Sequence, residues 1–79
     1  MPDYFDGFRI KGKLDEAIFL VGDLFSNEQR NYIIEYRDAG EWWLAFDTLC
    51  EILAEEELPV SQQLSDILKE IKQMFEASI

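Results

Sequence analysis

The chain has 79 residues, of which 17 are acidic and 7 are basic, so its net charge is −10. A chain of this length forms one small domain, which excludes an enzyme built around a cleft between two domains. Its apolar content of 48% exceeds that of disordered segments. The strong negative charge opposes contact with phosphate backbones, so direct nucleic-acid binding is not expected.

The residue types that most often carry chemistry are scarce. The sequence has no histidine, the commonest general base and metal ligand, and its single cysteine, Cys50, excludes an internal disulfide. It also has no glycine-rich phosphate loop. We therefore expect no enzymatic activity, no cofactor and no metal site, and we interpret Cys50 as a small buried apolar residue.

The N-terminus has neither the basic start nor the apolar run of a signal peptide. The longest apolar stretch, residues 17–22, is far too short to span a bilayer. These features, with a small domain that has no disulfide, predict a cytoplasmic protein.

Residues 1–79 are expected to form a single domain with two parts. Residues 1–13 contain Pro2, Gly7 and Gly12, and the Asp6-Gly7 pair lies between aromatic residues, which is typical of a turn. This pattern predicts a short hairpin or irregular N-terminal arm. Residues 14–79 are then expected to form a helical bundle.

The first helix is expected over residues 14–25. Gly22 weakens it by about 1 kcal/mol relative to alanine. Phe19 and Leu20 widen the apolar surface beyond one stripe, so this helix is expected to be largely covered. The residues at helical spacing are Leu14, Ala17, Ile18, Val21, Leu24 and Phe25.

Three more helices follow, at residues 27–38, 41–56 and from about 62 to 77. Ser26 and Ser61 are predicted N-caps, Gly40 is a predicted helix stop, and Pro59 separates the last two helices. The connections are short, which favours antiparallel neighbours. The sequence thus predicts an all-α fold, a compact bundle of about four helices.

The third helix carries an unusual distribution of charge. From Asp38 to Glu57 there are seven acids and no base, and Asp47, Glu51 and Glu55 are spaced four residues apart, which places them in one stripe. Like charges at this spacing destabilise a helix by a few tenths of a kcal/mol per pair. The stripe is therefore either a docking surface for a basic protein or a solvated face without a partner.

Two adjacent tryptophans begin the same helix, and they project about 100° apart. Trp42 is expected to point into the core with Phe46. Trp43 is expected near the edge of the acidic stripe, either as a binding hot spot or packed against another helix. Leu44 is in phase with the acids and is the better candidate for an exposed apolar contact.

Part of the sequence resembles the small bacterial immunity proteins of the MafI type. The likeness covers about residues 30–75, and the N-terminal arm does not share it. The residues that match in register are Gly40-Glu41, Leu44-Ala45, Asp47, Leu49-Cys50, Glu51, Leu53, Glu55 and Val60-Ser61.

The resemblance implies an all-helical fold and a role in neutralising a polymorphic toxin domain, including toxins of contact-dependent growth inhibition. Such toxins are often nucleases, and a nuclease needs a basic surface to bind its polyanionic substrate. An acidic helix face could dock on that surface. From phase and charge, we predict a toxin interface formed by Glu41, Trp43, Leu44, Asp47, Glu51 and Glu55.

Other interpretations remain open. The unmatched N-terminal arm is a rival contact surface for a toxin. The chain could instead be an acidic adaptor or regulatory domain, self-associating through its tryptophan face, or a nucleic-acid mimic that binds many basic proteins.

Overall fold

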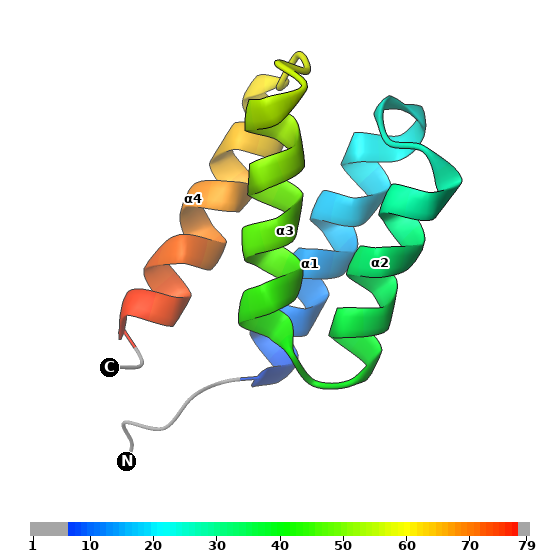
Figure 1. The fold of residues 1–79 in the computed structure, drawn as a ribbon. Helices are drawn as coiled ribbons and strands as arrows, with labels where there is room; N and C mark the ends of the chain where they lie inside the picture. The colour runs from blue at the N-terminus through cyan, green and yellow to red at the C-terminus, as the bar shows by residue number, and fades with distance from the viewer. Residues whose placement is uncertain (1–6, 78–79) are drawn as a thin grey trace.

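The computed structural model describes residues 7–77 as a bundle of four helices, which confirms the predicted all-α fold. The helices are α1 (Gly7–Val21), α2 (Asn27–Asp38), α3 (Trp42–Glu55) and α4 (Gln62–Ala77), and a 3₁₀ turn, η1 (Gly22–Leu24), follows α1. Successive helices run in opposite directions (Figure 1). None of the helices in the described range is long and apolar enough to cross a bilayer.

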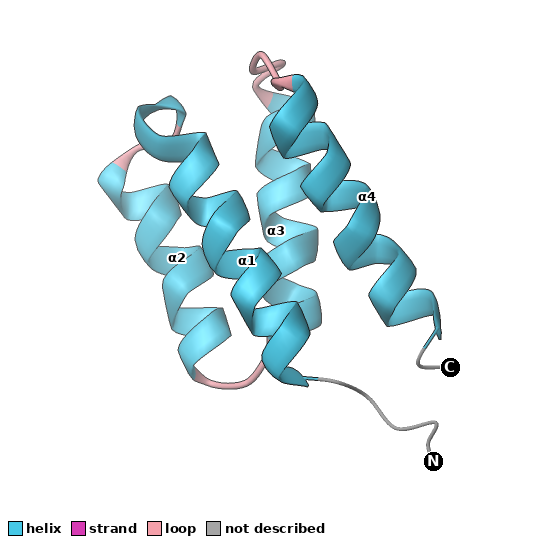
Figure 2. Ribbon diagram, turned by 180° about the vertical axis from the view of Figure 1, so that it is seen from behind, coloured by secondary structure: helices cyan, strands magenta, loops and turns pink. Residues whose placement is uncertain are grey.

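The helices are arranged so that α1 and α3 lie on opposite sides of the bundle. Helix α2 packs most closely against α3, and α1 packs most closely against α4. Helix α3 is nearest the viewer in Figure 1, whereas α1 is in front when the molecule is turned by 180° (Figure 2). The outer faces of α1 and α3 therefore point in different directions.

One apolar stripe from each helix forms the core. Within residues 7–77 no polar or charged side chain is buried. Each fully buried aliphatic side chain contributes about 1.5–3 kcal/mol relative to an exposed one. The largest fully buried side chains are Ile10, Leu14, Val21, Ile33, Leu49, Leu64 and Ile71.

The predicted boundary between an arm over residues 1–13 and a bundle over 14–79 is wrong, because α1 already begins at Gly7. Ile10 is only 1% exposed, and it continues the buried stripe one turn before Leu14. Burial of Ile10 contributes about 1.5–3 kcal/mol, more than the roughly 1 kcal/mol that Gly12 costs in a helix. The rest of the predicted arm, residues 1–6, lies outside the described residues.

The other end of α1 also differs from the prediction of a helix reaching Phe25. The helix ends at Val21 because Gly22 has a φ of +46°, which only glycine adopts readily. Phe25 is extended and 2% exposed, so it closes the core from outside the helix. The expectation that α1 is largely covered is wrong at Phe19, which is 83% exposed because it points away from the buried stripe.

The ends of α2 follow the predicted signals. Ser26 and Gln29 form a reciprocal capping box at its start. At its end, Gly40 has a φ of +80° and donates to the carbonyl of Arg37 at 3.1 Å, while the Glu41 N–H donates to Tyr36 at 2.8 Å. This is a Schellman motif with glycine at its left-handed position.

Helix α3 ends in the same motif without a glycine. The N–H of Glu57 donates to Ala54 at 3.3 Å, and that of Leu58 donates to Leu53 at 3.1 Å. Glu57 occupies the left-handed position with a φ of 51°. The next helix starts as predicted, with the Ser61 hydroxyl accepting from the Leu64 N–H at 3.1 Å.

Candidate functional site: the outer face of helix α3

The outer face of α3 brings together four of the six predicted interface residues. Their side chains are exposed, whereas Ala45, Phe46, Leu49 and Leu53 on the opposite side of the helix are buried. We call this surface the acidic face, and it consists of Leu44, Asp47, Glu51 and Glu55.

The carboxylates of the acidic face form no ion pair with a cation of the described residues. Among the described residues, the ion pairs of Lys13 and Arg37 go to acids on α1, α2 and α4 and do not reach α3. The last turn of α3 has no basic residue either. Glu55 lies at this C-terminal end, where the helix dipole disfavours an anion. The local charge pattern thus works against the stability of α3.

Apolar surface borders the acidic face. Leu44 is 40% exposed and lies among the acids, and Trp43 is 50% exposed at their edge. The Trp43 ring centroid is 5.2 Å from that of Phe75 on α4, in an edge-on arrangement, and 5.7 Å from that of Phe46. Trp43 therefore combines the two roles considered from the sequence, since it packs against another helix and still presents about half of its surface.

Glu41 is a predicted interface residue that does not lie on the acidic face. It precedes α3 as the N-cap, with φ −89° and ψ 62°, so helical phase does not place its side chain. It lines a shallow hollow with Gly40, Trp42, Trp43 and Phe75 at the start of α3. Glu41 and Trp43 thus lie together at one end of α3, beside the four residues of the acidic face.

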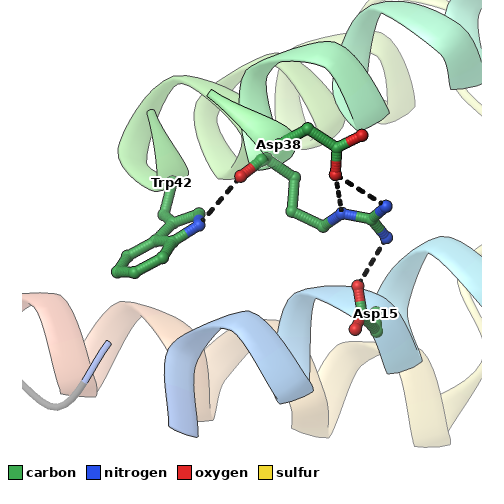
Figure 3. A network of polar contacts seen from close by, with 4 residues as sticks. Asp15, Asp38 and Trp42 are labelled. Atoms are coloured by element: carbon green, nitrogen blue, oxygen red, sulfur yellow. Dashed lines mark hydrogen bonds and ion pairs between the residues drawn. The ribbon is translucent and has the colours of Figure 1, made fainter. Parts of the chain in front are cut away.

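A polar network fixes the start of α3 against its neighbours (Figure 3). The Trp42 Nε1–H donates to the carbonyl of Arg37 at 3.0 Å. The Arg37 guanidinium donates to Asp15 Oδ1 on α1 at 2.6 Å and to Asp38 Oδ1 at 3.0 Å. The network connects α1, the end of α2 and the start of α3, so it helps to orient the acidic face.

Cys50 is not activated. It is half-buried, and burial, with a smaller effect of the Asp47 charge that Lys72 opposes, raises the pKa of its thiol to about 11. A thiol with this pKa is a poor nucleophile near neutral pH. Residues 7–77 also contain no group of three or more cysteine or acidic side chains placed to hold a metal ion. What the acidic face offers is charge and apolar contact for binding.

Two exposed aromatic residues on α1 were not recognised as surface features in the sequence. Phe8 is 90% exposed and Phe19 is 83% exposed. They are eleven residues apart, or about three helical turns, so they share one side of α1. The sequence shows that Phe8 and Phe19 share one side of a helix only when the helix is known to begin at Gly7.

Comparisons of the sequence with protein-family models and with curated proteins, and of the fold with solved structures, give no match.

Proposed function

We propose that this chain is a bacterial immunity protein that neutralises a cognate toxin domain by direct contact through the acidic face of α3. The observation that carries the proposal is the exposed row of Asp47, Glu51 and Glu55, which has no ion-pair partner in the described chain and adjoins the partly exposed Leu44 and Trp43. We place this action in the cytoplasm, where the toxin would otherwise act on its producer.

The charge of the acidic face suits a toxin that is a nuclease. A nuclease must attract polyanions, so it presents a basic surface at or near its active site. An acidic helix that occupies this surface competes with the substrate and needs no chemistry of its own. Opposite charges accelerate the encounter and favour the correct orientation.

The apolar residues beside the acidic face supply binding affinity that charge alone does not provide. Protection against a lethal enzyme requires nanomolar or tighter binding, about −12 kcal/mol. Buried aromatic and aliphatic anchors usually dominate such interfaces, and they act mainly by slowing dissociation. Leu44 and the open half of Trp43 are placed to act as these anchors.

The acidic face is also preorganised, because it lies on a regular helix rather than a loop. Ala45 and Leu49 on the inner side of α3 are both 0% exposed, and Trp42 is held by its hydrogen bond to Arg37. Little conformational entropy would be lost when this surface binds, which favours affinity.

A rescue assay tests the proposal. The C-terminal segment encoded by the neighbouring upstream reading frame is expressed alone and together with this chain, and an unrelated basic ribonuclease serves as the control toxin. We expect death from the upstream segment alone, survival when this chain is present, and no protection against the control toxin. A harmless upstream segment would contradict the immunity function. Protection against both toxins would instead indicate a general nucleic-acid mimic.

A further inference from the structure

The outer face of α1 has two phenylalanines that the fold leaves uncovered. Phe8 and Phe19 are 90% and 83% exposed. Eleven residues of helix separate them by roughly 16 Å along the axis. Both side chains lie on the same side of α1, where burial against another surface would be favourable.

The charges along this face are divided between its two halves. Arg9 and Lys11 lie near the start of α1, and Asp15 and Glu16 follow in its middle. All four are exposed, and within the chain Asp15 already pairs with Arg37 at 2.6 Å and Glu16 with Lys13 at 3.6 Å. A helix with its positive charges toward one end and its negative charges toward the other is complementary to an antiparallel copy of itself.

The two phenylalanines fit the same two-fold arrangement. When α1 is paired with an antiparallel copy centred near Lys13, Phe8 of one chain lies opposite Phe19 of the other. On one flank Arg9 then lies near Glu16 of the second copy, and on the other flank Lys11 lies near its Asp15. The Phe8–Phe19 contact and the two charged contacts each occur twice, as an isologous interface requires.

The surface of α1 has a hollow beside each phenylalanine. One lies over Gly12 and is bordered by Phe8 and Glu16, and a Cβ built on Gly12 would have no atom within 4 Å. The other lies beside Phe19, lined by Ile18 of α1, Gly22 of the 3₁₀ turn and Ile34 of α2. In the antiparallel arrangement each hollow faces a phenylalanine of the second copy.

We propose that a second copy of this chain docks on the outer face of α1, in an antiparallel two-fold pairing with Phe8 and Phe19 as its anchors. The acidic face of α3 cannot serve this purpose, because two such faces repel each other. Since α1 and α3 lie on opposite sides of the bundle, the dimer would leave both acidic faces open (Figures 1 and 2).

The area buried in the contact determines how tightly the two copies are expected to associate. The four phenylalanines of two copies would bury roughly 600–1,000 Å². This lies below the range of stable complexes and in that of weak, reversible ones. The dimer is thus expected at high protein concentration and not in dilute solution.

Sedimentation equilibrium of the full chain, from roughly 10 µM to 1 mM, tests the pairing. The mass should rise from 9.3 kDa toward twice that value with concentration. Phe19→Ser should lower the association constant by about tenfold or more. Tyr32→Ser, at an aromatic residue on α2 that is 56% exposed, should have no effect. A wild-type chain that stays monomeric at the highest concentration, or an equal effect of both substitutions, would overturn the proposal.

A charge-exchange experiment tests the antiparallel register itself. One variant carries Arg9→Glu and the other carries Glu16→Lys, at two residues that lie opposite each other in the proposed pairing. Each alone places like charges opposite each other and should be monomeric, whereas their mixture should form a heterodimer. Each substitution changes the net charge of −10 by two units, to −12 and −8, so both variants remain negative and overall attraction cannot drive the mixing. Absence of a heterodimer from folded variants, checked by circular dichroism, would overturn the arrangement.

Discussion

Helices α1 and α3 have similar inner faces and very different outer faces. Leu14 on α1 and Leu49 on α3 are both 0% exposed in the same core. On the outside, α1 has both signs of charge between two exposed phenylalanines, whereas α3 has acids and no base of its own. The inner pattern determines the fold, and the outer pattern determines which partners each helix can accept.

Because of this difference, α1 is suited to association with a second copy of the chain, whereas α3 is suited to binding a different protein. The charges on the outer face of α1 are complementary to those of an antiparallel copy, while the acidic face of α3 repels a copy and requires a basic partner. A folded domain can thus present two interaction surfaces whose partners are distinguished by charge pattern alone.

The largest expected effect is a difference in the free energy of unfolding between substitutions at buried and at exposed residues. Leu14→Ala and Leu49→Ala should each lower the free energy of unfolding by about 2–5 kcal/mol, because each leaves a cavity in the core. Phe19→Ala and Leu44→Ala should change it by less than about 0.5 kcal/mol in dilute solution. Urea denaturation measures all four. A core-sized loss at Phe19 would show that the outer face of α1 belongs to the fold of the monomer.

Gly12→Ala should change stability and association in opposite directions. Alanine in the helix interior should raise the free energy of unfolding by about 1 kcal/mol, since nothing obstructs the added methyl group. The same methyl group partly fills the hollow expected to face Phe19 of a second copy, so dimerisation should weaken. Gly22→Ala is the matched control, and it should destabilise the chain because Gly22 has a φ of +46°. Destabilisation by Gly12→Ala would contradict this account of α1.

Glu55→Lys should stabilise the isolated chain by about 0.5 kcal/mol at low salt. The lysine would complement the C-terminal dipole of α3 and form a favourable pair with Glu51 one turn earlier. Glu28→Lys, in the first turn of α2, should have the opposite sign, because acids are favoured there. Urea denaturation at low and high salt measures both, and high salt should reduce both effects. A loss of stability in Glu55→Lys would mean that the acidic face is not costly to the fold.

The smallest expected effect is that of the Asp47 charge on the pKa of the Cys50 thiol. The Cys50 thiol should titrate near pH 11, and Asp47→Asn should lower its pKa while leaving it above the ordinary 9.0, because burial is the larger cause. Since the unfolded thiol ionises first, stability should fall as the pH rises from about 9 to about 11. Thiolate absorbance against pH measures the titration. An unchanged pKa in Asp47→Asn would show that this carboxylate does not act on Cys50.

The sequence predicts most of the fold because three helices carry explicit signals. Ser26, Gly40 and Ser61 mark helix ends that the structure places where expected. The sequence does not indicate the start of α1, because Gly7 and Gly12 favour a turn locally. The helix forms because Ile10 is buried by contacts with residues distant in sequence. The helix and turn propensities of neighbouring residues contain no information on such distant contacts.

The candidate site was predictable to a similar degree. Helical phase places Leu44, Asp47, Glu51 and Glu55 on one exposed side of α3. It fails at Glu41, because that residue precedes the helix. The surface of α1 could not be found without its correct boundary, since Phe8 falls in the predicted arm and Phe19 in a helix expected to be covered.

The most direct test of the acidic face is the rate of association with the purified toxin domain from the rescue assay. Asp47→Lys with Glu51→Lys should slow association by roughly tenfold or more, because both charges lie in the contact. Glu28→Lys with Glu35→Lys changes the net charge equally at exposed sites on α2 and should have a much smaller effect. Equal association rates for the two variants would contradict the claim that the outer face of α3 meets the toxin.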